Sequence, residues 1–291
     1  MYERIKADNL CKRYGPVVAL DSVSITVYAG ECFGIFGLSG SGKSTLMRLL
    51  AGIEKPDSGI ISGNTPSAFC PQYPVIAEAL TPFEALWFYA AMYGIPRSKR
   101  HNAVREALLL VDLDSERNRR IGKLRGGARR LVEIARTLLG PHNLLLLDEP
   151  MAGLDFQLRR RLWERLLRIR VRDKVTVIVA TSRPEDAELC DRIALMHEGR
   201  LLAVGTAAQL RGMAGPEALV IKPVKAEKTR SRRGWSGVVS REQEGSLVVE
   251  IGAESQPVEL LREISGDIAG VRMKNRRLDD VLEELIRGVL T

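Results

Sequence analysis

Hydrophobic and polar residues alternate near the start of the chain in a way that predicts strands. Residues 5–9 and 22–28 read as short strands, the second with clear alternation, and residues 31–36 form an apolar run followed by glycine. After Gly42 the sequence KSTLMRLLAG has the spacing of an amphipathic helix and ends in glycine. An antiparallel start therefore leads into a buried strand, a glycine loop and a helix.

Helical periodicity dominates the middle of the chain. Apolar residues recur at helical spacing over residues 80–92 and 99–111, which predicts a helical insertion. Two continuous apolar runs, NLLLLDEP and KVTVIVATS, follow it, with the amphipathic stretch LDFQLRRRLWERLLRI between them. Such runs are typical of strands that are buried on both faces of a parallel sheet. The pattern predicts an α/β architecture.

The pattern of apolar and basic residues changes beyond residue 215. A predicted strand, LVIKP, precedes the basic segment VKAEKTRSRRG, and short apolar runs lead to a final amphipathic helix, RLDDVLEEL. We expect a nucleotide-binding domain over residues 1–215, with a helical subdomain at about 74–132. Residues 216–291 are expected to form a small α+β accessory domain containing a basic linker. The last helix places its core-facing side chains on one stripe: Leu278, Val281, Leu282, Leu285 and Ile286.

The amino-acid composition indicates which broad class of protein this chain belongs to. The chain has 291 residues with 45% hydrophobic and 27% charged content, and no apolar run approaches the roughly 18 residues that span a bilayer. The N-terminus lacks the pattern of a secretory signal and the four cysteines show no CxxC pairing, so a reducing cytoplasm fits best. The net charge of +8 is compatible with a nucleic-acid or membrane partner, but spread-out charges without interleaved aromatics favour a solvated basic surface.

A glycine-rich stretch, GLSGSGKST, matches the pattern GxxxxGK[ST] between a predicted strand and a predicted helix. In such a loop, backbone N–H groups and a helix N-terminus surround phosphate, the lysine reaches phosphate oxygens and the following hydroxyl serves Mg²⁺. We expect Lys43 and Ser44 in these roles, with a merely flexible loop as the weaker alternative. The expected nucleotide-binding residues of the loop are Gly37, Leu38, Ser39, Gly40, Ser41, Gly42, Lys43, Ser44 and Thr45.

Two adjacent carboxylates end the predicted strand LLLLDEP. Asp148 is expected to hold Mg²⁺ and Glu149 to polarise the attacking water as a general base. The alternative is that these acidic residues simply end a strand. The preceding phosphate loop favours the catalytic interpretation.

With these motifs the chain resembles the ATP-binding cassette (ABC) ATPases over about residues 5–212. The motifs occur in order: KRYG with Tyr14, the phosphate loop, FCPQ with Gln72, GKLRGGARR, LLLLDEP, and AGLD ending in Asp155. The resemblance implies a P-loop NTPase (RecA-like) core with an antiparallel β subdomain. It also implies that Tyr14 stacks on adenine, that Gln72 touches Mg²⁺ and the water, and that Asp155 helps to pair two cassettes. Taken alone, Tyr14 or Gln72 would more often be structural.

Two positions depart from the family pattern. In the family, two cassettes enclose two ATP molecules, and a signature motif from one chain reaches the nucleotide of the other. Arg125 occupies the signature serine position before Gly126 and Gly127. An arginine in place of this serine removes a helix cap worth about 1 kcal/mol. A guanidinium can nevertheless bind phosphate. Ser182 stands where the family has a histidine that orients the water and the base. We expect ATP binding with Mg²⁺, and hydrolysis that is slow or supplied asymmetrically.

The single cassette with a C-terminal extension ending in RRLDDVLEELIRG resembles subunits of drug- and polysaccharide-exporter transporters, which favours export, with import as the alternative. This implies partnership with an integral membrane permease and a second cassette, on the cytoplasmic face of the inner membrane. Phe83, Leu86, Trp87 and Phe88 either receive a permease helix or pack inside the helical subdomain.

Two alternative functions stay open. One is a catalytically impaired, ATP-gated regulatory or assembly subunit. The other is a soluble ABC ATPase acting on ribosomes or nucleic acid, although no nucleic-acid partner is expected, because such relatives generally carry two cassettes or a long coiled coil.

Overall fold

The computed structural model describes residues 2–63, 67–213, 218–223, 240–243, 246–250, 268–274 and 277–289. The chain forms two compact units, Met1–Ala207 and Ala208–Thr291. The sequence places the domain boundary near residue 215, and that boundary stays a prediction. Among the described residues, no helix combines the length and apolar character needed to cross a bilayer.

The centre of the first unit is a six-stranded sheet with the order β5-β6-β7-β3-β8-β9. Its strands are parallel except for β9, which runs antiparallel to β8. The bounds are β3 (Cys32–Phe36), β5 (Ser67–Cys70), β6 (Leu144–Asp148), β7 (Thr176–Thr181), β8 (Arg192–His197) and β9 (Arg200–Gly205). Every residue of β3, β6 and β7 is buried, as the continuous apolar runs predict. The predicted α/β class is confirmed.

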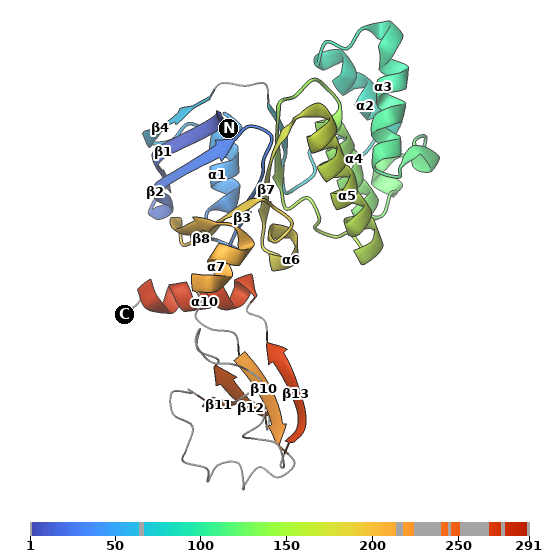
Figure 1. The fold of residues 1–291 in the computed structure, drawn as a ribbon. Helices are drawn as coiled ribbons and strands as arrows, with labels where there is room; N and C mark the ends of the chain where they lie inside the picture. Colours follow the sequence, from blue (N-terminus) through green and yellow to red (C-terminus); the bar gives the residue numbers. More distant parts are fainter. Residues whose placement is uncertain are drawn as a thin grey trace. The chain divides into compact units, whose positions relative to one another are not determined.

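A second, antiparallel sheet lies beside the central sheet, with helix α1 (Lys43–Leu50) packed into the core between them (Figure 1). Its order is β2-β1-β4, with bounds β1 (Glu3–Tyr14), β2 (Val17–Tyr28) and β4 (Ser58–Ser62). The apolar face of α1, which includes Leu46 and Leu49, contacts this sheet and the central strands in one buried cluster. The phosphate loop is thus anchored by a strand on one side and a packed helix on the other.

Helices α2 to α5 lie on the opposite side of the first unit from β1, β2 and β4 (Figure 1). The bounds are α2 (Pro82–Met92), α3 (Arg97–Leu110), α4 (Gly126–Leu138), α5 (Phe156–Asp173) and the short α6 (Pro184–Ala187), with 3-10 turns at Asp114–Glu116 and Ile121–Lys123. Helix α2 begins with a capping box, in which Thr81 accepts from the amide of Glu84 at 3.2 Å and Glu84 accepts from the amide of Thr81 at 2.8 Å. The helix-rich middle of the chain is therefore present as predicted.

The second unit contains an antiparallel sheet with the order β11-β12-β10-β13. The bounds are α7 (Ala207–Met213), β10 (Ala218–Pro223), β11 (Ser240–Gln243), β12 (Ser246–Glu250), β13 (Ile268–Lys274) and α10 (Leu278–Val289). Leu278, Val281 and Leu282 on the predicted stripe of α10 are buried. The predicted basic segment at residues 224–234 lies outside the described residues.

Candidate functional site

The phosphate loop connects β3 to α1 and is shaped by two glycines. Gly42 is the N-cap of α1 and has a φ of 97°, in the left-handed region that favours glycine. A Cβ atom at Gly42 would lie 2.5 Å from the carbonyl oxygen of Ala19, and one at Gly37 would lie 2.2 Å from that of Met196. Close packing of backbone against backbone therefore explains why glycine occupies both positions.

Lys43 points back into this loop from the first turn of α1. Its Nζ donates to the carbonyl oxygens of Gly37 at 2.7 Å and Leu38 at 2.9 Å. Burial lowers the pKa of Lys43, while the nearby charges of Glu149 and Asp148 oppose that shift. The ammonium group thus lies beside the backbone amides and helix N-terminus that make such loops attract anionic phosphate.

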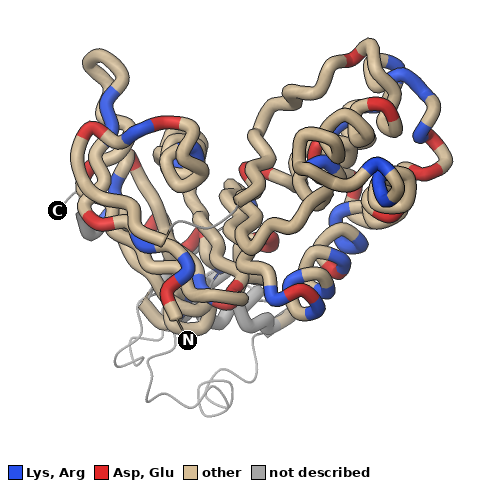
Figure 2. The backbone as a smooth tube through the Cα atoms, turned by 90° about the horizontal axis from the view of Figure 1, so that it is seen from above, with Lys and Arg blue, Asp and Glu red and all other residues tan. Residues whose placement is uncertain are grey.

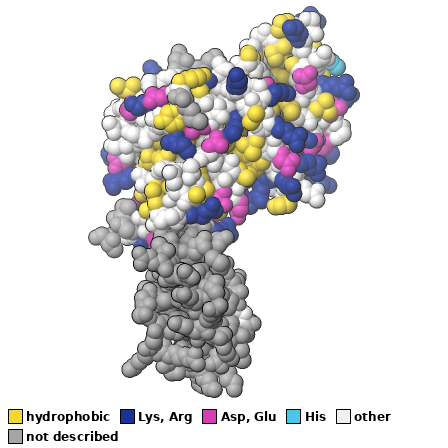
Figure 3. Space-filling model, viewed as in Figure 1, with side chains coloured by type: hydrophobic (Ala, Val, Ile, Leu, Met, Phe, Trp, Pro, Cys, Tyr) yellow, Lys and Arg dark blue, Asp and Glu magenta, His cyan; other side chains and the backbone are white. Residues whose placement is uncertain are grey.

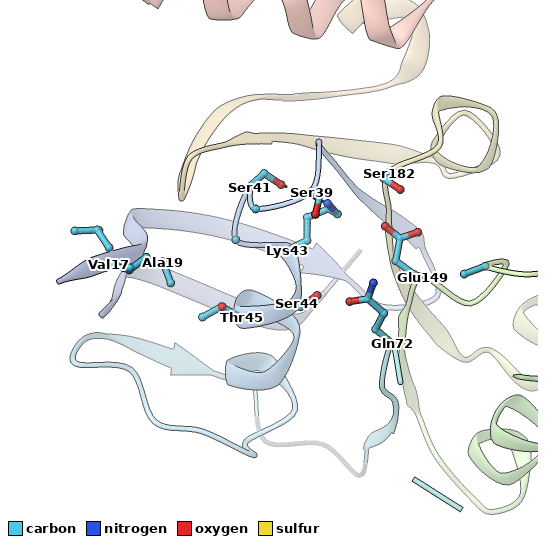
Figure 4. Close-up of a pocket in the computed structure, with 14 residues that line it drawn as sticks. Val17, Ala19, Ser39, Ser41, Lys43, Ser44, Thr45, Gln72, Glu149 and Ser182 are labelled. Atoms are coloured by element: carbon cyan, nitrogen blue, oxygen red, sulfur yellow. Dashed lines mark hydrogen bonds between the residues drawn. The ribbon is translucent and has the colours of Figure 1, made fainter. Parts of the chain in front are cut away.

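A cavity of about 380 Å³ opens beside the loop, a volume in the range of small-molecule sites. It brings together residues that lie far apart in the sequence (Figure 4). The predicted site residues that line it are Ser39, Gly40, Ser41, Gly42, Lys43, Ser44, Thr45, Gln72, Glu149 and Ser182. The cavity is also lined by Val17, Val18, Ala19 and Ala152, which sequence reasoning missed because their small or apolar side chains carry no chemical signal.

Asp148 ends β6 and is 2% exposed. Burial raises the pKa of Asp148, and a hydrogen-bonding contact with Ser44 opposes that shift. Among the described residues, no donor reaches its buried Oδ1 atom. An uncompensated buried carboxylate oxygen is costly, and oxygen ligands are what Mg²⁺ prefers. Asp148 and Ser44 therefore fit a magnesium ion at the edge of the cavity.

Glu149 follows Asp148 with a φ of 47°, an uncommon value for a residue with a side chain. Two backbone hydrogen bonds hold this conformation: its amide donates to Ala180 O at 2.8 Å, and its carbonyl accepts from Ala152 N at 3.1 Å. The carboxylate lies between Ser182 and Gln72 (Figure 4). Burial raises the pKa of Glu149, whereas contacts with the Ser182 hydroxyl and amide lower it. A raised pKa suits a carboxylate that accepts a proton.

Gln72 reaches the cavity from the segment after β5. Arg130, a buried residue of α4, donates to the carbonyl oxygen of Gln72 at 3.2 Å and also to those of Pro71 and Asp148. Sequence reasoning missed Arg130 because it stands in a basic run and resembles a solvated residue. Its only sequence signal is its place on the same helical face as apolar residues.

Tyr14 lies at the end of the β1–β2 hairpin, where it pairs with Val17, a residue that lines the cavity. Its hydroxyl donates to Glu54 and accepts from Arg48 Nη2 at 3.3 Å. Tyr14 is exposed and does not line the cavity. Stacking of Tyr14 on adenine therefore stays a prediction.

The predicted cross-dimer residues lie outside the cavity of their own chain. Arg125 is the N-cap of α4, and among the described residues its side chain makes no capping hydrogen bond. A Cβ atom at Gly127 would lie 3.0 Å from Gly153 O, so the start of α4 packs against the loop that precedes Asp155. Gly126 and Asp155 are exposed. These residues form a group separate from Lys43 and Glu149.

The four residues expected either to receive a permease helix or to pack inside the helical subdomain differ in burial. Phe83 stacks on Trp87 with ring centroids 5.8 Å apart and contacts the ring of His101 at 5.5 Å. Leu86 is fully buried, whereas Phe88 is 59% exposed. Leu86 therefore packs inside the helical subdomain. Phe83 and Trp87 contact neighbours but are half-buried, so permease contact stays a prediction for them and for Phe88.

Comparison with known proteins identifies the family. The model of the ABC transporter family matches residues 20–152. The Nod factor export ATP-binding protein I of Burkholderia lata is 35% identical over 210 residues, covering 68% of this chain and 69% of the relative. The protein of the same name from Rhizobium sp. (strain N33) is 36% identical over 208 residues, covering 67% and 68%. A solved ATP-binding subunit of an ABC transporter is 27% identical, with a TM-score of 0.65 over 72% of this chain and 92% of that one.

The family match includes the phosphate loop, Gln72 and both carboxylates. The fold, the order of the motifs and the sequence relatives all indicate the same family. The chain belongs to the ABC transporter family, as an ATP-binding subunit with ATPase chemistry.

Proposed function

We propose that this subunit hydrolyses Mg²⁺–ATP to energise export through a separate integral membrane permease. The observation that carries the proposal is the cavity in which Lys43, Ser44, Gln72, Glu149 and Ser182 meet. Similarity to Nod factor export ATP-binding proteins of Burkholderia lata and Rhizobium sp. supports export rather than import.

Each side chain of the cavity has a role that its surroundings support. Lys43 binds phosphate oxygens, and Ser44 and Asp148 hold Mg²⁺, which supplies charge neutralisation at the phosphates when bound. Glu149 accepts a proton from the attacking water, and Gln72 orients that water. Ser182 takes the place of the family histidine and keeps the Glu149 carboxylate ionised and oriented.

In this proposal, a second cassette completes the nucleotide-binding site. Arg125, Gly126, Gly127 and Asp155 do not line the cavity of their own chain, yet they resemble the family's dimer contacts. Gly126 and Asp155 are exposed, which leaves them accessible to a partner. We infer that this group faces the phosphate loop of the second cassette, so that ATP closes the pair and hydrolysis lets it reopen.

The permease partner is expected to dock near Gln72 and α2. Phe88 and Met92, one turn apart on α2, are 59% and 63% exposed. Tyr73 and Val75, in the segment just after Gln72, are also exposed. Exposed apolar side chains that gather into a contiguous patch mark protein-interaction surfaces. The proposal places the subunit on the cytoplasmic face of the membrane, where ATP is available.

A second candidate, an ATP-gated subunit with impaired turnover, is favoured by two departures from the family pattern. Arg125 leaves α4 without a side-chain cap within the described structure, and Ser182 is shorter than the family histidine. The nucleic-acid alternative receives less support. On α5, Arg160, Arg165 and Arg170 pair with acidic side chains, and basic and acidic residues are interspersed in both Figure 2 and Figure 3.

The proposed site is tested by titrating ATP into the purified chain with and without Mg²⁺. We expect Mg²⁺ to strengthen ATP binding in the wild type and to have little effect in the Asp148→Asn variant. Because burial raises the pKa of Asp148, the amide should leave the free protein at least as stable as the wild type. Asp173→Asn, at an exposed residue that pairs with Arg172 on the far end of α5, is the matched control. Equal Mg²⁺ dependence in both variants would contradict the assignment.

A further inference from the structure

Helix α4 carries three buried charged side chains on one face. Arg130, Glu133 and Arg136 are spaced three residues apart, and they are 4%, 0% and 8% exposed. Charged groups are rarely buried unless they are paired and hydrogen-bonded. We call these three residues the α4 ladder. Their partners show what the burial achieves.

The central residue of the ladder holds two backbone amides. Glu133 Oε1 accepts from the amide of Val75 at 2.5 Å and from that of Ile76 at 2.8 Å. Its Oε2 atom accepts from Arg136 Nε at 3.1 Å. Both oxygens of the buried carboxylate therefore have partners, and two of these partners come from the segment that follows Gln72.

The two arginines donate to backbone carbonyl groups in β5 and in the loop that leads to Gln72. Arg136 Nη2 donates to Phe69 O at 2.8 Å, and Arg130 Nη1 donates to Gln72 O at 3.2 Å and to Pro71 O. Arg130 Nη2 also donates to the carbonyl of Asp148, at the end of β6. The ladder thus binds the chain before, at and after Gln72, and it links that chain to Asp148 at the end of β6, next to Glu149.

The segment needs such partners because it is irregular. Residues 71–80 form neither helix nor strand, so their backbone groups lack the partners that regular structure supplies. A loop held only by exposed contacts would sample several positions. Here Arg130 and Glu133 bond backbone groups of this segment, and Arg136 bonds the adjoining strand β5. The Gln72 side chain lines the cavity.

We propose that Glu133 is a positioning residue, which with Arg130 and Arg136 fixes the Gln72 segment against Asp148 and Glu149. The same helix begins at Gly126, next to Arg125. The ladder therefore couples the end of α4 that is expected to face the second cassette to the Gln72 segment expected to face the permease. This inference rests on the proposed function for the role of Gln72. The contacts between α4 and the Gln72 segment do not depend on that function.

The first test is amide hydrogen exchange at Val75 and Ile76 in the full chain. Glu133→Ala removes both acceptors, and we expect exchange at these amides to rise roughly tenfold or more, given the strength of hydrogen bonds to charged groups. Glu133→Gln keeps an acceptor oxygen but loses the ion pair with Arg136, so we expect an intermediate effect. The conservative variant also serves if Glu133→Ala does not fold.

Glu78→Gln is the matched control. Glu78 is an exposed carboxylate that pairs with Arg129 of the same helix at 2.7 Å, but the pair lies at the surface. Exposed ion pairs contribute little, so this variant should exchange like the wild type. Unchanged exchange at Val75 and Ile76 in folded Glu133→Gln and Glu133→Ala would overturn the proposal.

The second test measures ATP turnover and ATP affinity in the same variants. A mispositioned Gln72 should lower kcat by roughly tenfold while KM for ATP stays near the wild-type value, because the phosphate loop is untouched. Equal losses in Glu78→Gln and Glu133→Gln would contradict positioning by the ladder. Failure of the proposed function is a different result: the wild type would show no turnover, whereas the exchange measurement would still report whether Glu133 holds the segment.

Discussion

Asp155 caps helix α5 by accepting a hydrogen bond from the amide of Leu158 at 2.9 Å. Arg125 stands at the equivalent place before α4, where its guanidinium offers no acceptor to the free amides of the first turn. The two loops touch, because a Cβ atom at Gly127 would lie 3.0 Å from Gly153 O. Two helices that begin side by side thus differ in how their first turns are satisfied.

The capping and pairing roles of Asp155 can be separated by substitution. We expect Asp155→Ala to lower the free energy of unfolding by about 1 kcal/mol through loss of the cap, whereas Asp155→Ser keeps an acceptor and stays near the wild type. Urea denaturation measures both. If Asp155 also pairs cassettes, the Asp155→Ser variant will be stable yet associate less in the presence of ATP. Equal stability of the alanine and serine variants would contradict the capping role.

Replacement of Arg125 by serine should stabilise the chain. A serine at the N-cap accepts from the first-turn amides of α4, so we expect Arg125→Ser to raise the free energy of unfolding by about 1 kcal/mol. Arg125→Ala removes the same guanidinium without adding an acceptor and should give no such gain. Thermal unfolding of the three proteins makes the comparison.

The same variants report on hydrolysis. If Arg125 slows hydrolysis at the nucleotide site shared by two cassettes, Arg125→Ser will turn over ATP faster than the wild type, whereas Arg125→Ala will not. A loss of turnover in both variants would instead show that the guanidinium is a working phosphate contact.

Ser182 should set the acid limit of ATP hydrolysis through Glu149. Burial raises the pKa of Glu149 and the contacts with Ser182 lower it. A general base works only when it is ionised, so kcat falls as pH drops through this raised pKa. Ser182→Ala removes the hydroxyl, raises the pKa of Glu149 further and moves the acid limb of the kcat profile to higher pH.

Ser182→Thr is the control, because it keeps a hydroxyl at the same position. Its acid limb should match that of the wild type. Acid limbs that superimpose for the alanine variant and the wild type would show that Ser182 does not act on Glu149.

Much of the fold follows from local patterns in the sequence. The buried strands β3, β6 and β7 appear as continuous apolar runs, and the glycine spacing around Lys43 is sufficient to identify the phosphate loop. The extent of β1 is harder to predict. The sequence indicates a strand over residues 5–9, whereas β1 spans Glu3–Tyr14, because register shifts between Ala7 and Lys12 interrupt the alternation of side chains.

The charged interior of the site lies beyond what sequence patterns predict. Glu133 and Arg136 resemble an ordinary exposed ion pair on a helix, and only the tertiary position of α4 buries them against the Gln72 segment. Likewise, the contact between Ser182 and Glu149 joins residues that follow two different strands. Such relationships depend on which strands are neighbours, and the neighbours β6 and β7 are separated in the chain by α5.

Steady-state ATP hydrolysis tests the central claim most directly, measured for the wild type and Glu149→Gln in the assembly with a membrane subunit. The exposed Glu164→Gln variant serves as the control. We predict Mg²⁺-dependent turnover that falls by roughly a hundredfold or more in Glu149→Gln, since general bases contribute on that scale, and that persists in Glu164→Gln. Wild-type turnover in Glu149→Gln, or tight ATP binding by a wild type that never turns over, would contradict the account.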